Sequence, residues 1–241
     1  MSGLSNIFGK MQKVEGINNI HPIRLNQYEE FMECAQLLSL TEKHFEESAV
    51  EKHTLFELVV GQGIKADVIH RFIHMLYLVT GELFELKIAD MEFTFIGGFD
   101  MYLDKTNFES FREVTMKQNL LYEDKVFKNP MVKQWADKVL EARSRNSVDM
   151  SLEDIVSVVH VFTGISYDDI SAYTIYQLKH TFQRILKVED YNRDIQFMCA
   201  GDDKTKPKPF MEKIELYQNP YDDVFVDKNK LNNLNKAIGN K

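Results

Sequence analysis

Cysteine is scarce in this sequence, and its placement limits the chemistry that the chain can support. The 241 residues include 2 cysteines, Cys34 and Cys199, and these do not form a CxxC pair. This excludes a disulfide-stapled scaffold and the common cysteine-based zinc motifs. Both cysteines fall within amphipathic stretches, so we expect buried free thiols in a reducing cytoplasm.

Basic residues are also fewer than acidic residues in this sequence. The chain has 29 Lys and Arg residues against 37 Asp and Glu residues, for a net charge of −8. Nucleic acids and anionic membranes attract proteins mainly through Lys and Arg, so this balance argues against both as general partners. One basic cluster, Lys204, Lys206 and Lys208, alternates with Thr and Pro and is typical of a solvated loop.

Long apolar runs are missing. The most apolar window, residues 68–86, contains Arg71, Glu82 and Glu85, which are too costly to place at the centre of a membrane. The first residues, MSGLSNIFGKMQK, lack the apolar core of a secretion signal. The sequence therefore predicts a soluble protein without a membrane partner.

Complete catalytic motifs are absent as well. His70 and His74 have an i, i+4 spacing that can hold a metal, but Arg71 stands where a zinc protease has Glu. The Gly61-Gln62-Gly63 segment lacks the preceding strand that a phosphate-binding loop requires, and no GxSxG segment marks a nucleophilic serine. We expect no catalytic residue, no metal, no cofactor, and no enzyme activity.

Strong helix boundaries are present between residues 149 and 201. Hydroxyl residues stand three positions before an Asp or Gln at three places, which is the pattern of a helix N-terminal capping box. Glycines follow the first and last of these helices, where a left-handed cap is expected. These boundary residues are Ser151 with Asp154, Ser166 with Asp169, Thr174 with Gln177, and the two glycines Gly164 and Gly201. Thr106 with Glu109 predicts a further box.

The last of these helices carries one long apolar line, which predicts a packing surface along its length. Its members are Ile175, Leu178, Phe182, Ile185, Val188, Tyr191, Ile195 and Met198.

The rest of the chain also favours helices, so the predicted fold is mainly α, a multi-helix globular body with extended termini. Its one convincing β signal is an alternating apolar pattern around a Gly-Gly turn, which predicts a small β-hairpin around residues 84–103. The predicted parts are an N-terminal arm (1–20), a helical lobe with the hairpin (21–143), a C-terminal helical lobe (149–217) and a polar tail (218–241).

Several segments together resemble conserved proteins from the structural gene clusters of bacteriophages that infect Gram-positive bacteria. The segments are IHPIRLNQYEEFMECAQLLSL, FTFIGGFDMYLDKTNFESFREVTMKQN and EDIVSVVHVFTGISYDDISAYTIYQLKHTFQRI. A fourth, KVEDYNRDIQFMCAG followed by FMEKIEL, is similar to the ending of phage tail-assembly and baseplate-associated proteins. The resemblance implies a phage morphogenesis protein, either a chaperone of tail or baseplate assembly or a minor virion component. It supplies no catalytic residues.

The sequence therefore predicts a non-enzymatic protein that works through protein–protein contacts in tail or baseplate assembly. The alternative is an intracellular phage protein that binds and regulates a host factor. Expected partners are other phage structural or assembly proteins, with self-association left open. The expected location is the host cytoplasm during assembly, with the virion as a second possibility. Aromatic and apolar residues dominate such contacts. The proposed anchors are Tyr173, Tyr176, Phe210, Tyr221, Leu231 and Leu234.

Overall fold

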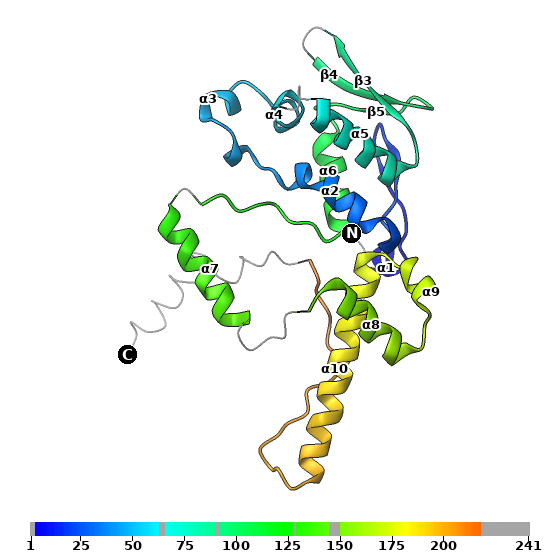
Figure 1. Ribbon diagram of the computed structural model, residues 1–241, viewed down its shortest axis with the longest axis vertical. Helices are drawn as coiled ribbons and strands as arrows, with labels where there is room; N and C mark the ends of the chain where they lie inside the picture. Colours follow the sequence, from blue (N-terminus) through cyan, green and yellow to red (C-terminus); the bar gives the residue numbers. More distant parts are fainter. Residues whose placement is uncertain (1–2, 63–65, 90–91, 128, 145–149, 218–241) are drawn as a thin grey trace.

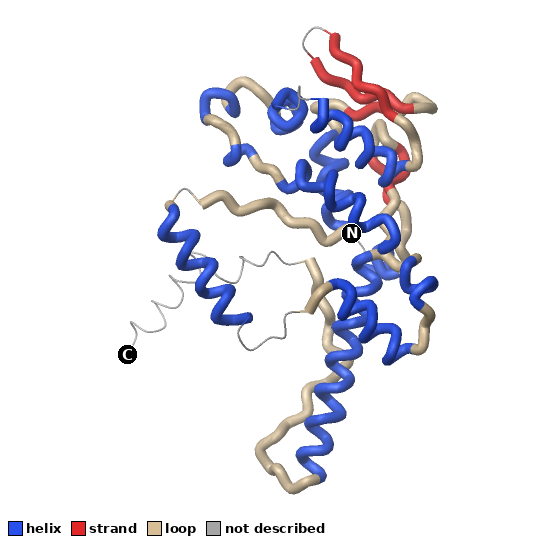
Figure 2. The backbone as a smooth tube through the Cα atoms, in the orientation of Figure 1, coloured by secondary structure: helices blue, strands red, loops and turns tan. Residues whose placement is uncertain are grey.

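The computed structural model describes residues 3–62, 66–89, 92–127, 129–144 and 150–217, and most of these are helical (Figures 1 and 2). The prediction of a mainly α fold is confirmed. The helices are α1 (Gly3–Ile7), α2 (Tyr28–Ser39), α3 (Glu47–Val50), α4 (Leu55–Gln62), α5 (Ala66–Thr80), α6 (Phe108–Gln118), α7 (Pro130–Ser144), α8 (Leu152–Thr163), α9 (Tyr167–Ser171) and α10 (Ile175–Cys199). Two short 3-10 helices, η1 (Leu25–Gln27) and η2 (Glu42–His44), lie before and after α2.

The predicted hairpin is confirmed as part of a three-stranded antiparallel sheet. Its strands are β3 (Phe84–Ala89), β4 (Glu92–Gly97) and β5 (Tyr102–Leu103), in the order β3-β4-β5. Phe84 pairs with Gly97, and Phe95 pairs with Leu103. A side chain at Gly97 would come within 2.9 Å of the Phe84 ring, which explains the glycine at this position.

A second hairpin corrects the expectation of an N-terminal arm over residues 1–20. Strands β1 (Gln12–Val14) and β2 (Asn18–Ile20) pair with each other. Val14, Ile17 and Ile20 are buried in the main core. Strands of three residues give almost no periodic signal, and distant side chains hold this hairpin in place. The Asn107 amide donates to the Glu15 carbonyl at 3.0 Å, and the Gln118 amide donates to the Ile20 carbonyl at 3.3 Å.

The main hydrophobic core lies among α2, α4, α5, α6 and the two hairpins. Four phenylalanines from different elements form its centre. The Phe72 ring stacks on Phe95 at 4.9 Å, and Phe56 lies 5.2 Å from Phe108. Burial of each such side chain stabilises the fold by about 1.5–3 kcal/mol. The core therefore joins segments that are far apart in the sequence.

A second hydrophobic core lies among α8, α9 and α10. Its buried members are Leu120, Val159, Ile170, Ile175, Leu178 and Phe182. Backbone hydrogen bonding connects it to the first part of the chain, because the Leu25 N–H donates to the Tyr173 carbonyl at 2.8 Å. The Gln177 amide also donates to the Ile7 carbonyl at 2.9 Å. The division of the chain into separate lobes stays a prediction.

The predicted boundaries of α8, α9 and α10 are confirmed. Ser151, Ser166 and Thr174 each accept a hydrogen bond from the backbone N–H three residues later. Gly164 closes α8 in the left-handed conformation. The box predicted at Thr106 and Glu109 was wrong, because the Thr106 hydroxyl donates to Asp104 instead, at 2.6 Å.

Loss of the α10 cap should cost a measurable part of the stability. Thr174 is 4 % exposed, and its hydroxyl accepts from the Gln177 N–H at 3.2 Å. We expect Thr174→Ala to lower the free energy of unfolding by about 1.5 kcal/mol in urea titrations. The same change inside α10, Thr181→Ala, removes no cap and should cost less than about 0.5 kcal/mol. Equal losses in both variants would contradict the capping role.

The apolar line along α10 does not form a single packing surface, which corrects that expectation. An α-helix has 3.6 residues per turn, but successive members of the line are mostly three residues apart. The line therefore rotates around the helix axis by roughly 220° between its first and last members. Ile175, Leu178 and Phe182 are buried in the second core. Tyr191 packs instead against Phe210, at 5.4 Å. Phe210 belongs to residues 202–217, which run back along α10 and which we call the returning segment (Figure 1). The second half of α10 projects away from the other helices (Figure 1).

Candidate protein interaction surface

The histidine pair on α5 lies at the surface. His70 is exposed, and the His74 Nε2 atom lies 2.7 Å from the Glu30 carboxylate. The His74 ring also lies against Tyr77, with centroids 6.3 Å apart. In the described ranges no group of three or more His, Cys, Asp or Glu side chains is placed to hold a metal. The geometry of His74 is that of a surface histidine with a carboxylate partner.

The two cysteines differ in environment, which corrects half of the expectation. Cys34 is buried, whereas Cys199 at the end of α10 is exposed. Burial raises the pKa of the Cys34 thiol, with a smaller contribution from the Glu33 carboxylate. A protonated, enclosed thiol is a poor nucleophile. Cys199 falls on the part of α10 that projects beyond the second core, and its apolar neighbours in the sequence gave no sign of this.

An open hollow of about 840 Å³ lies between α6 and residues 122–127. The Arg112 guanidinium in its wall forms hydrogen bonds within the chain. It donates to the Leu38 carbonyl at 2.7 Å and to the Glu123 carboxylate at 2.9 Å. Lys117 pairs with Glu113 beside it. The Arg112 contacts join α6 to α2 and to residues 122–127, so we interpret the hollow as structural.

The described members of the proposed anchor set contact other segments of the same chain through the backbone or the side chain. Tyr173 is half-buried and its carbonyl accepts from the Leu25 N–H. Tyr176 is half-buried against the second core, and Phe210 contacts Tyr191. The other anchors, Tyr221, Leu231 and Leu234, lie outside the described residues. A role for any of the six in partner binding stays a prediction.

Helix α8 carries more apolar surface than its own fold covers. Of its 12 residues, LEDIVSVVHVFT, only Val159 is fully buried. Seven are apolar: Leu152, Ile155, Val156, Val158, Val159, Val161 and Phe162. At 3.6 residues per turn, Ile155, Val158, Val161 and Phe162 gather on one side of the helix, which we call the α8 flank. Ile155 and Val158 pack partly against the second core, whereas Val161 is 71% exposed and Phe162 is 53% exposed.

Hydrogen bonds and ring stacking stabilise both ends of α8, so the backbone that carries the α8 flank is rigid. At its start, the Ser151 hydroxyl and the Asp154 carboxylate form a reciprocal capping box. At its end, the His160 ring lies 2.7 Å from the Ile165 carbonyl and stacks on Tyr167 at 4.2 Å. A rigid apolar surface loses little conformational entropy on binding.

The α8 flank has an acidic border. Asp154 lies one turn before Val158 and two turns before Val161. Hydrogen bonds from the Ser151 hydroxyl and the Ser151 backbone N–H lower the pKa of the Asp154 carboxyl. Asp154 therefore stays negatively charged at neutral pH. Ile155, Val158 and Phe162 have the i, i+3, i+7 spacing of a helix that packs into the groove of a partner. This geometry fits a protein partner with an apolar groove and a basic rim.

Comparisons with known proteins centre on this part of the chain. A family model described as the YomV second domain matches residues 143–215, which include α8, α9, α10 and most of the returning segment. The SPbeta prophage-derived uncharacterized protein YomV of Bacillus subtilis (strain 168) is 32% identical over 116 residues. That alignment covers 48% of this chain and 48% of the relative, so the chain spans about half the length of the curated relative that it matches. No solved structure matches the chain.

These matches connect the chain with a phage-derived protein family, and this part of the expected resemblance is confirmed. Neither description mentions a tail or a baseplate, so that finer assignment stays a prediction. Among the described residues, no helix combines the length and the apolar character needed to cross a membrane. The α8 flank lies within the matched residues, whereas the main core and its two hairpins lie outside the family-model match.

Proposed function

We propose that this chain is a non-enzymatic phage protein that acts in particle assembly, at the tail or baseplate, by binding another phage protein through the α8 flank. The observation that supports this best is the exposure of Val161 and Phe162 beside half-buried Ile155 and Val158 on a capped helix. An apolar helix face left uncovered on a folded protein marks a contact site more often than a catalytic one.

The location of the flank within the matched segment adds support. Residues 143–215 are similar to a family model described as a second domain, and two exposed apolar side chains of the α8 flank, Val161 and Phe162, lie within these residues. The acidic border at Asp154 adds a preference for basic partners. Both features suit a lasting contact between proteins.

The flank should be dispensable for folding. We expect the double substitution Val161→Asp and Phe162→Ser to change the free energy of unfolding by less than about 0.5 kcal/mol, because both side chains are mostly exposed. The matched core variant Phe182→Ala, at a position 6 % exposed, should cost about 3 kcal/mol. Urea unfolding followed by circular dichroism measures both. A flank variant as destabilised as the core variant would show that the flank packs within the chain.

A genetic experiment tests the assembly role. A phage that lacks this gene is supplied with the wild-type chain or with the flank variant, and particles are counted by electron microscopy after infection. We expect complete particles with the wild-type chain and tailless or incomplete particles with the variant. Normal particles together with altered host takeover would instead favour the regulator of a host factor.

A further inference from the structure

The projecting half of α10 carries a second exposed line, which is separate from the α8 flank. Its members are Leu186, Asp190, Arg193 and Phe197, spaced by four, three and four residues. This spacing keeps all four side chains on one side of the helix, with Leu186 and Phe197 about 16 Å apart along the axis. Leu186 is 40% exposed and Phe197 is 50% exposed. We call this line the α10 stripe.

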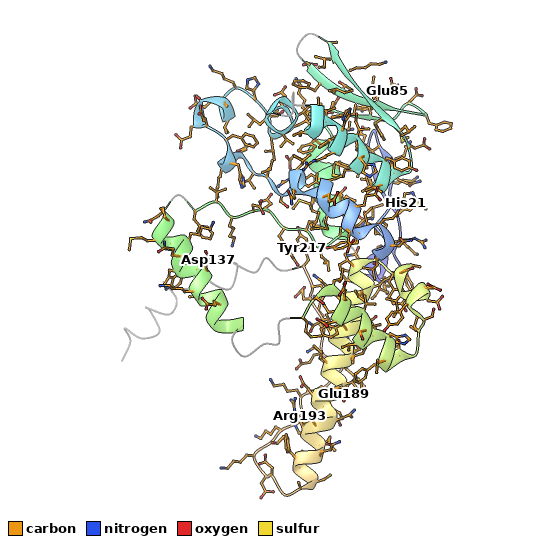
Figure 3. The ribbon with its side chains drawn as sticks, viewed as in Figure 1. His21, Glu85, Asp137, Glu189, Arg193 and Tyr217 are labelled. Carbon is orange, nitrogen blue, oxygen red and sulfur yellow. The ribbon has the colours of Figure 1, made fainter. Side chains whose placement is uncertain are left out.

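The returning segment makes hydrogen bonds and an ion pair on another side of α10, and it borders the α10 stripe at a shallow hollow that Asp190 and Arg193 line together with Pro209. The Arg184 guanidinium donates to the Phe210 carbonyl, and Lys187 pairs with Glu212 at 2.9 Å. With 100° per residue, Arg184, Lys187 and Tyr191 point at least about 60° away from every member of the stripe. Figure 3 shows Arg193 on this projecting part, beyond the second core.

The α10 stripe is complementary to itself. The midpoint between residues 186 and 197 lies between residues 191 and 192. The midpoint between residues 190 and 193 lies at the same place. When two copies of α10 lie antiparallel about that point, Leu186 of each faces Phe197 of the other. Asp190 of each then faces Arg193 of the other. A two-fold interface requires a surface of this kind, since each residue meets its counterpart twice.

We infer that the α10 stripe binds a second copy of this chain in an antiparallel helix pair. Charge complementarity supports this occupant: the Asp190 carboxylate and Arg193 guanidinium lie 2.8 Å apart within one copy, with 61% and 58% of their side chains exposed. Arg193 also lies 3.9 Å from the Asp194 carboxylate, and the exposure of Asp190 and Arg193 leaves room for a further ion pair across the two-fold axis. The flanking Leu186 and Phe197 supply the apolar contact. This inference goes beyond the proposed function and does not depend on it.

The pair should be weak, because three turns of helix bury less area than a permanent dimer does. We expect the full chain to self-associate with a dissociation constant of about 10–100 µM, in the range of small, transient interfaces. Sedimentation equilibrium of the wild-type chain up to a few hundred micromolar measures this. A strictly monomeric chain over that range overturns the inference.

Charge reversal gives the decisive test. Asp190→Arg alone places two arginines opposite each other, and Arg193→Asp alone places two aspartates opposite each other. We expect each single variant to associate at least about 10-fold more weakly than the wild type. An equimolar mixture of the two restores both opposite-charge pairs and should regain association as a heterodimer. Since mixing cannot repair a contact within one copy, a mixture that stays monomeric overturns the inference.

The matched controls change net charge by the same amount away from the stripe. Asp203→Arg and Lys206→Asp lie in the exposed loop after α10 and should leave the wild-type association within about twofold. Helix content by circular dichroism confirms that each variant is folded. An equal loss of association in these controls would show a general effect of charge and would overturn the pairing.

Cross-linking tests the direction of the pair. In a Cys199→Ser background, Leu186→Cys and Phe197→Cys variants are oxidised separately and as a mixture. We expect disulfide-linked dimers in the mixture at least about 10-fold above either variant alone, since each position faces the other across the two-fold axis. Dimers formed equally well by each variant alone would show parallel or random contact and would overturn the antiparallel arrangement.

Discussion

Replacing Arg112 by Met is expected to lower the free energy of unfolding by about 3 kcal/mol, because it removes the donor of two backbone carbonyl groups at the end of α2. The Arg112 side chain is 7% exposed. Its Nε donates to the Leu38 carbonyl at 2.7 Å and an Nη atom donates to the Leu40 carbonyl at 2.9 Å. Another Nη atom lies 2.9 Å from the Glu123 carboxylate. Methionine fills similar space but leaves both carbonyls without this donor.

Urea unfolding of Arg112→Met against the wild type measures this loss. The matched control is Glu109→Gln, which removes a neighbouring carboxylate that is 63% exposed and 3.5 Å from the guanidinium. An exposed ion pair of this kind contributes less than about 0.5 kcal/mol. If Arg112→Met costs less than about 1 kcal/mol, Arg112 does not connect α6 to the end of α2 in the way described.

Gly16→Ala should lower the free energy of unfolding by about 3 kcal/mol or more. Gly16 has a φ of +79°, a left-handed conformation that costs other residues about 1–2 kcal/mol. An added Cβ would also lie 2.3 Å from the Asn107 amide nitrogen and 2.9 Å from the Tyr102 carbonyl oxygen. Neither neighbour can move freely. Asn107 holds the Glu15 carbonyl, and the Tyr102 N–H donates to the Gly16 carbonyl at 2.7 Å.

Gly81→Ala separates the two contributions. Gly81 has nearly the same φ, +77°, but an added Cβ there meets no atom within 4 Å. We expect a loss of about 1 kcal/mol at Gly81, from the backbone conformation alone. Equal losses in the two variants, measured by urea unfolding, would mean that the N-terminal hairpin does not press against β5 and the start of α6.

The helix boundaries could be predicted from sequence because their causes are local. Ser151 and Thr174 bind backbone groups three residues away, and Gly164 needs only its own left-handed conformation. The N-terminal hairpin could not be predicted in this way. Its position depends on Asn107 and Gln118, which lie about 90 or more residues further along the chain. The capping box at Thr106 was wrongly predicted because the Thr106 hydroxyl donates to the nearby Asp104 carboxylate instead.

The candidate surface was missed for a related reason. Sequence reasoning favoured aromatic anchors such as Tyr173 and Tyr176, but a tyrosine beside a core also packs within its own chain. The useful signal was the excess of apolar residues in α8, since its 12 residues include seven apolar ones and the fold fully buries one. Which side of a helix stays uncovered depends on tertiary packing, so the sequence could indicate the excess but not its location.

The most direct test of the central claim is a quantitative co-purification from phage-infected cells. The tagged wild-type chain and the Val161→Asp, Phe162→Ser variant are isolated in parallel, and the phage proteins bound to each are measured by mass spectrometry. The control Glu153→Gln changes the net charge by one at an exposed position of α8, about 80° or more around the helix from every member of the α8 flank. We predict that a phage structural or assembly protein accompanies the wild-type chain and the control, and falls at least about 10-fold with the flank variant. Equal recovery of that protein with all three chains would contradict a role for the α8 flank in binding.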